Sequence, residues 1–250
     1  MASAQSGSGG GPRVLVVQHE SDAPPLRLDA AAEAAGLRLD VVGVDRGEAL
    51  PPDLDGFAGL VVLGGSMDVA DAPGLPYLYE TMDLIRLAAR EERPSLGICL
   101  GAQLAAAALG GEVRRGEAGA EVGWVEVRTT EAGRADPVTT PLGEAAPLFQ
   151  WHHDVFEPPA GSSLLLTADR YPHQGFRLGL AWGIQAHPEL TAEAIRQWAG
   201  SPGGLADLRR VGLTERDLLE RAEERGQAGQ RMLEAWCREV AEPATATSRG

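Results

Sequence analysis

Residues 97–103, GICLGAQ, constrain the fold of this chain more than any other segment. They begin within an apolar run at 94–99 and lead into small residues at 103–109. This order predicts a strand, a tight glycine turn and a helix, with Cys99 at the elbow between them. A side chain at such an elbow stands clear of the sheet, and the free N–H groups of the helix N-terminus point toward it.

Cys99 is therefore a candidate nucleophile. The positive end of a helix dipole favours the thiolate, which is the reactive form of a cysteine. The chain has only 2 cysteines, so a disulfide framework is not the reason for Cys99. A buried structural cysteine beside a tight turn is the alternative interpretation.

A second segment, QAHPE at 185–189, supplies a base for this nucleophile. It overlaps the end of an apolar run at 180–186, which we expect to be a strand. A residue before proline is pushed toward an extended conformation, and residues two apart in an extended chain face the same side. We therefore predict that Glu189 orients the imidazole of His187 and that His187 acts as the base. With Cys99 they would form a catalytic triad.

The third element is a pair of glycines after a buried strand. The apolar run at 59–63 is followed by Gly64 and Gly65. Glycine lets the backbone come close to a ligand and present an N–H group to it, so Gly64 is a candidate substrate contact. We predict that the N–H groups of Gly65 and Leu100 form an oxyanion hole. An ordinary turn at the strand end is the alternative.

These segments together make the chain resemble the class I, triad-type glutamine amidotransferases. The resemblance is strongest to stand-alone proteins related to the glutaminase domain of GMP synthase, and it covers about residues 14–190. The motifs that carry it, in chain order, are VVLGGSM at 61–67, LGICLGAQ at 96–103, EVGW at 121–124, WHHD at 151–154, and FRLG at 176–179 with WGIQAHPE at 182–189. Ala102 stands where many members carry histidine, which leaves the triad untouched.

The resemblance implies a specific reaction and a set of substrate contacts. Cys99 attacks the side-chain amide carbon of glutamine, ammonia leaves, and water hydrolyses the γ-glutamyl thioester. Gln103 lies one helical turn past Cys99, and the resemblance implies that it binds the substrate. The backbone near Gly123 and Trp124 would contact the amino-acid end. The resemblance also implies that His152 and Asp154 border the pocket. A structural hydrogen-bonding role is the alternative for these two residues.

The order of segments predicts an α/β fold with an open, mainly parallel central sheet and helices on both faces, flavodoxin-like as in class I glutamine amidotransferases. A small antiparallel extension and a C-terminal helical appendage would complete it. Catalytic groups would gather at the carboxyl ends of the strands. The expected strands lie at 14–18, 39–44, 59–63, 94–99, 125–128, 164–167 and 180–186. The expected helices include 26–35 and one whose apolar face carries Leu78, Met82, Ile85 and Ala89.

We expect a flexible tail over residues 1–11, the amidotransferase domain over 12–200 and the helical appendage over 201–250. In the appendage, Thr214 and Asp217 predict a capped helix start. A second helix there carries an apolar stripe: Met232, Leu233, Trp236, Cys237 and Val240. Packing on the domain's own core is the favoured interpretation, and a docking surface is the alternative.

Composition excludes several classes of partner and of catalytic chemistry. The net charge is −14, which argues against a nucleic-acid partner, and the absence of lysine excludes a Schiff-base lysine or a lysine-bearing phosphate loop. No apolar run reaches about 18 residues and the N-terminus lacks a secretory signal, so we expect no membrane span and a reducing, cytoplasmic location. We expect neither a cofactor nor a metal.

Three functional classes remain. The first is a glutaminase that passes ammonia to an acceptor. Because the chain has no ATP-binding synthetase segment, either the acceptor enzyme would be a separate protein or the acceptor would react at the same site. The second is a hydrolase or transferase of γ-glutamyl peptides or amides that uses the same triad. The third is a non-catalytic regulatory binding protein. The intact set of Cys99, His187 and Glu189 favours the first two.

Overall fold

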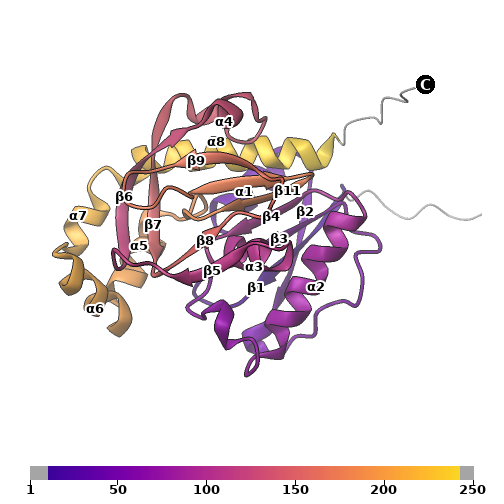
Figure 1. The fold of residues 1–250 in the computed structure, drawn as a ribbon, viewed down its shortest axis with the longest axis horizontal. Coiled ribbons are helices and arrows are strands. Elements are labelled where there is room, and N and C mark those ends of the chain that lie inside the picture. The colour runs from indigo at the N-terminus through magenta and orange to yellow at the C-terminus, as the bar shows by residue number, and fades with distance from the viewer. Residues whose placement is uncertain (1–10, 243–250) are drawn as a thin grey trace, which may run out of the picture.

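A mixed β-sheet forms the centre of the protein in a computed structural model that describes residues 11–242 (Figure 1). The strands are β1 (Arg13–Gln18), β2 (Arg38–Gly43), β3 (Gly59–Val62), β4 (Ser95–Ile98), β5 (Glu112–Arg115), β6 (Glu121–Thr129), β7 (Ala145–His152), β8 (Asp154–Glu157), β9 (Ser163–Thr167), β10 (Gly175–Leu178) and β11 (Ala181–Ile184). In the described residues, nine of them form the sheet in the order β2-β1-β3-β4-β11-β10-β9-β6-β7. Neighbours from β2 to β11 are parallel, and those from β11 to β7 are antiparallel.

Helices cover both faces of the parallel part. The helices are α1 (Arg27–Ala34), α2 (Pro76–Arg90), α3 (Leu100–Ala108), α4 (Glu131–Ala135), α5 (Ala192–Gly200), α6 (Pro202–Val211), α7 (Glu215–Leu219) and α8 (Ala222–Ala241). Because strand residues alternate between faces, β1 directs Val14 and Val16 toward α1 and α8, and Leu15 and Val17 toward α2 and α3. A third apolar cluster joins β6 and β7 to α5, α6 and α7.

The predicted fold class is confirmed. Each expected strand is present, with ends shifted by at most a few residues. The helix expected from residue 103 begins earlier, at Leu100, directly after Cys99. On α2, Leu78, Met82 and Ile85 are buried as expected, but Ala88 is buried in place of Ala89. The antiparallel extension contains four strands of the sheet, and the sequence patterns indicated neither β7 nor β10.

The C-terminal helices pack on the same core as the sheet. The predicted stripe on α8 is buried against strand residues of the first cluster, as the favoured interpretation required. Asp217 accepts a hydrogen bond from the Thr214 N–H at 2.7 Å, and Thr214 caps α7 as predicted. The domain boundary at residue 200 stays a prediction, and the tail expected over 1–11 lies, apart from Gly11, outside the described residues.

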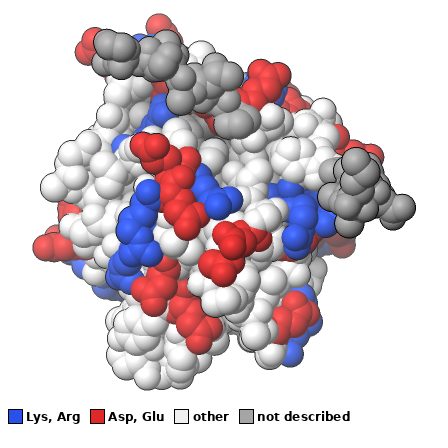
Figure 2. Space-filling model, turned by 90° about the vertical axis from the view of Figure 1, so that its right-hand side faces the viewer, with Lys and Arg blue, Asp and Glu red and all other residues white. Residues whose placement is uncertain are grey.

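The surface carries mixed charge. On the face in Figure 2, arginine and carboxylate side chains lie next to one another. Within residues 11–242, no helix combines the length and the apolar character needed to cross a membrane.

Candidate active site

Cys99 occupies a sharp turn between β4 and α3. Its backbone has φ 51° and ψ −107°, a conformation that costs free energy for a residue with a side chain. Its N–H donates to the Ile184 carbonyl at 2.9 Å, which ties the turn to β11. The first turn of α3 packs closely against β3, because a Cβ on Gly101 would lie only 2.0 Å from the Val62 oxygen. The structure thus places Cys99 at an elbow of the kind expected for a nucleophile.

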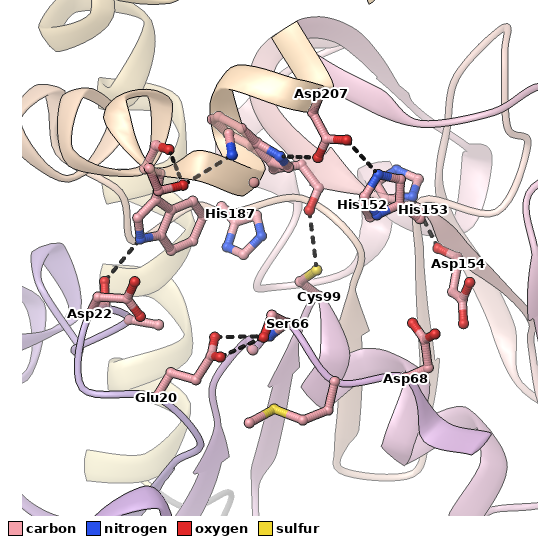
Figure 3. A pocket seen from close by; sticks show the side chains of 18 of the residues that line it. Glu20, Asp22, Ser66, Asp68, Cys99, His152, His153, Asp154, His187 and Asp207 are labelled. Carbon is pink, nitrogen blue, oxygen red and sulfur yellow. Dashed lines mark hydrogen bonds and ion pairs between the residues drawn. The ribbon is translucent and has the colours of Figure 1, made fainter. Parts of the chain in front are cut away.

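His187 and Glu189 meet beside this cysteine. His187 Nδ1 lies 2.8 Å from Glu189 Oε1, and both side chains are buried. Burial by itself would lower the pKa of His187, but the charges of Glu189 and Cys99 and their hydrogen bonds outweigh it and raise this pKa to about 10. The imidazole stands next to the Cys99 thiol (Figure 3). The arrangement supports an imidazolium held between a carboxylate and a sulfur.

Gly65 and Leu100 have backbone N–H groups without a protein acceptor in the described part of the chain. Leu100 opens α3, and Gly65 follows the end of β3 and lines the same pocket as Cys99. Within residues 11–242, no carbonyl or side chain accepts a hydrogen bond from either N–H. The two residues are close, because a Cβ on Gly65 would lie 3.1 Å from Leu100 Cδ2. Free donors beside a nucleophile are what an oxyanion hole requires.

Gly64 gives the imidazole room. A Cβ at this position would lie 3.0 Å from His187 Cε1 and 3.6 Å from Cys99 Cβ. Contact this close is tighter than a side chain tolerates without displacing its neighbour. Gly64 therefore contributes through its lack of a side chain, which lets His187 stand over the end of β3.

A cavity of about 290 Å³ opens over Cys99. Its carboxylates surround the sulfur in Figure 3, whereas no arginine lines it among the described residues. These carboxylates are Glu20, Asp22, Asp68, Asp154 and Asp207. Within the same part of the chain, no three His, Cys, Asp or Glu side chains are arranged to hold a metal ion.

Gln103, His152 and Asp154 all line this cavity. Gln103 Nε2 donates to the Asp154 carbonyl at 3.0 Å. His152 Nδ1 lies 3.0 Å from the same carbonyl, and its Nε2 lies 3.1 Å from Glu121 Oε2. Both ring nitrogens of His152 are therefore engaged within the protein, which favours its structural hydrogen-bonding role.

The structure does not bring Gly123 and Trp124 to the cavity. Gly123 has φ +103°, and a Cβ there would lie 3.3 Å from Leu213 and Leu218 side-chain carbons. Trp124 Nε1 donates to the Leu218 carbonyl at 2.8 Å. Helix α7 therefore packs over these two residues, and the expected contact with the amino-acid end of a substrate is not supported here.

One wall of the cavity comes from α6, which the sequence patterns did not connect with the site. Ser201, Gly203, Gly204 and Asp207 line it. Asp207 is buried and accepts hydrogen bonds from Trp151 Nε1 at 3.1 Å and His153 Nε2 at 3.0 Å. The Ser-Pro-Gly-Gly start at 201–204 signals a helix N-terminus, but nothing local shows that this helix faces Cys99.

We expect Asp207→Ala to loosen α6. Asp207 also accepts from Arg210 on its own helix at 3.3 Å, so the substitution removes three hydrogen bonds, two of which tie α6 to Trp151 and His153. Hydrogen bonds to a charged group contribute about 1.5–3 kcal/mol each, so losing the two that tie the helix down should speed amide exchange across 202–211 at least about tenfold. Hydrogen exchange read by mass spectrometry measures this, with the exposed Arg209→Ala on the same helix as control. Unchanged protection of α6 in Asp207→Ala would show that these bonds do not hold the wall.

His19 packs against the segment that follows β3, next to Gly65. It is fully buried, its Nδ1 lies 3.2 Å from the Leu63 carbonyl, and a Cβ on Gly65 would lie 3.1 Å from its Cβ. Burial lowers the pKa of His19 to about 4, although the Leu63 carbonyl opposes this shift.

We expect this histidine to make folding sensitive to acid. The unfolded chain takes up the proton near pH 6.5 and the folded chain only near pH 4, so stability is lost as pH falls through that window. The total loss in the free energy of unfolding across this window is about 3 kcal/mol, of which about 2 kcal/mol is lost between about pH 7 and about pH 5. Urea unfolding at about pH 7 and about pH 5 should show a smaller loss in His19→Gln than in the wild type. The half-buried control His173→Gln should behave like wild type, and an equal loss in His19→Gln would refute the assignment.

Comparison with known proteins now assigns the family. The family model described as "Glutamine amidotransferase class-I" matches residues 27–197. The chain belongs to this family. It is 33% identical over 187 residues to the glutamine amidotransferase-like protein YfeJ of Salmonella typhimurium, covering 73% of this chain and 78% of that protein. It is also 34% identical over 145 residues to the glutamine-hydrolysing GMP synthase of Symbiobacterium thermophilum, covering 56% of this chain but only 26% of that enzyme.

Solved amidotransferase structures share the fold over nearly the whole chain. A glutamine amidotransferase from Thermotoga maritima superposes with a TM-score of 0.83 at 29% identity, covering 92% of this chain and 98% of the other. One from Methylobacillus flagellatus gives 0.80 at 28% identity, covering 91% and 93%. The family match ends at residue 197, so helix α6 and its cavity wall lie beyond it.

Proposed function

We propose that this class I amidotransferase hydrolyses the side-chain amide of glutamine through Cys99, His187 and Glu189. The observation that carries the proposal is the buried His187–Glu189 pair, 2.8 Å apart, beside a cysteine held at a helix N-terminal elbow. A nucleophile, a base and a carboxylate that orients the base are the parts of a triad. A cavity over the sulfur provides the space for a small substrate.

In the first half-reaction the Cys99 thiolate attacks the amide carbon, and the carbonyl electrons move to oxygen. The N–H groups of Gly65 and Leu100 stabilise the oxyanion; losing one such donor typically costs roughly 100- to 1000-fold in rate. As the intermediate collapses, the His187 imidazolium gives its proton to the leaving nitrogen. Ammonia departs and a γ-glutamyl thioester remains on Cys99.

In the second half-reaction neutral His187 takes a proton from water, and the resulting hydroxide attacks the thioester carbonyl. The oxyanion forms again at the same two N–H groups. Its collapse expels the Cys99 thiolate and leaves the γ-carboxylic acid of glutamate. Glu189 keeps the imidazole oriented and stabilises the imidazolium through both halves.

The released ammonia would pass to a separate enzyme. Relatives of the chain include glutamine-hydrolysing GMP synthases and the small chain of carbamoyl phosphate synthase from Maricaulis maris, which is 32% identical over 199 residues. The chain spans 26% of the Symbiobacterium GMP synthase and 43% of that small chain. We propose a synthetase partner on this basis.

A γ-glutamyl amide or peptide is the second candidate substrate. The cavity is lined by carboxylates and by no arginine among the described residues, and the chain contains no lysine. Negative charge around a pocket attracts a cationic ligand. A leaving group with a free ammonium would fit this surface better than an acidic one.

Initial rates of nitrogen release from purified protein separate the candidates. Glutamine is compared with γ-glutamyl amides whose leaving amines are neutral, cationic or acidic. Ammonia release from glutamine supports the glutaminase, and faster release of cationic amines supports the second candidate. Absence of turnover with every compound, together with no covalent capture at Cys99, would contradict both.

A further inference from the structure

Gln185 is a fully buried polar residue whose side chain contacts the nucleophile. It follows β11 and lies two residues before His187. Its Nε2 donates toward Cys99 Sγ at 3.8 Å, within the range of a hydrogen bond to sulfur. Its Oε1 is buried and has no hydrogen-bond partner in the described part of the chain. The sulfur is therefore the one side-chain partner of this carboxamide among residues 11–242.

Such a carboxamide is a poor choice for stability alone. A buried carbonyl oxygen left without a donor costs free energy, and an apolar side chain of similar size would avoid that cost. The polarity of Gln185 is explained if its amide N–H is needed as a hydrogen-bond donor to the Cys99 sulfur.

The sulfur has one neighbour that accepts a hydrogen bond and one that donates a hydrogen bond to it. The Trp151 carbonyl lies 3.8 Å from Sγ and can only accept, so it interacts with the S–H form. The amide N–H of Gln185 can only donate to sulfur, and a hydrogen bond donated to the charged form of a group favours that form. Gln185 therefore acts in the same direction as the imidazolium of His187, from the end of the neighbouring strand.

We propose that Gln185 is a positioning residue that donates a hydrogen bond to the Cys99 thiolate and fixes the sulfur for attack. This rests on the proposed nucleophilic role of Cys99. When sulfur bonds to the γ-carbonyl carbon, its negative charge is lost and the hydrogen bond weakens. When the thiolate leaves in the second half-reaction, the same bond re-forms. Gln185 would thus also assist deacylation, without exchanging a proton itself.

The test follows the rate of Cys99 alkylation by iodoacetamide against pH. Peptide mass spectrometry reads Cys99 separately from Cys237, whose pKa burial raises to about 12. In Gln185→Met the donor is lost at similar size, and the pH midpoint of alkylation should rise by about one unit, a tenfold change in the thiolate equilibrium. Gln185→Glu, which places a carboxyl there, should raise it at least as much. The exposed amide variant Gln227→Met, on α8 and outside the cavity lining, should leave the midpoint unchanged.

Each outcome decides the matter. An unchanged midpoint in Gln185→Met overturns the proposal, and a lowered one does too, because it would mean that the carboxamide oxygen accepts from the thiol. Thermal unfolding of Gln185→Met should match or exceed the wild type, and failure to fold would show that Gln185 serves the fold instead. Alkylation needs no turnover, so a shifted midpoint in a protein that turns over none of these amides and is not captured at Cys99 by a glutamine mimic would refute the proposed function while leaving this role of Gln185 standing.

Discussion

Cys99→Ala is expected to abolish nitrogen release from glutamine and from γ-glutamyl amides while the protein stays folded. Alanine removes the sulfur that forms the thioester in the proposed mechanism, and a nucleophile that works as a unit with its base typically contributes about 10⁶-fold to turnover. Alanine can adopt the elbow backbone conformation, φ 51°, at the same cost as cysteine. The substitution removes only a small side-chain group. A coupled ammonia assay and thermal unfolding measure the two quantities.

Cys237→Ala is the matched control for this substitution. Cys237 is also buried, but it lies on α8 within the apolar core. Its variant should keep the wild-type rate, with at most a lower unfolding temperature from the small cavity. Substantial activity in Cys99→Ala would eliminate the thioester mechanism.

His187→Ala is expected to be nearly as severe, with a loss of roughly 10⁴-fold or more. The variant lacks both the base for the thiol and the acid for the leaving nitrogen. It also leaves Glu189 as an unpaired buried carboxylate, so unfolding free energy should fall by about 3–5 kcal/mol. The rate must therefore be measured below the unfolding temperature and divided by the folded fraction.

Glu189→Gln separates orientation from proton transfer. The amide can still accept a hydrogen bond from the imidazole, so the loss should be milder than in His187→Ala. His153→Ala, which alters a histidine that lines the cavity and pairs with Asp207, is the control for a general disturbance. An equal loss in Cys99→Ala, His187→Ala and Glu189→Gln would mean that Glu189 does more than orient. Unimpaired labelling of Cys99 by a glutamine mimic in His187→Ala would exclude His187 as the activating base.

The core of the site was predictable because each part has a local cause. A glycine turn between an apolar run and small helical residues places Cys99 at an elbow, and proline after His187 keeps that residue extended. The three segments then converge because β3, β4 and β11 are parallel neighbours, and Gly65, Cys99 and His187 follow their carboxyl ends.

The remainder depends on contacts between distant parts of the chain. Asp207 meets Trp151 and His153 across 56 and 54 residues of sequence, and no periodicity reports that contact. The expectation for Gly123 and Trp124 came from resemblance alone, and α7 packs over both of them. Gln185 was visible in the motif, but its role depends on a burial and a hydrogen bond that the motif does not show.

Covalent capture tests the central claim most directly. Purified protein is incubated with a glutamine-mimicking diazoketone, with and without excess glutamine, and the modified residue is mapped by mass spectrometry. We predict that the adduct forms on Cys99, that glutamine slows it, and that Cys237 stays unmodified. An adduct elsewhere, no adduct, or labelling of Cys99 that glutamine does not slow would contradict a glutamine-hydrolysing site at Cys99.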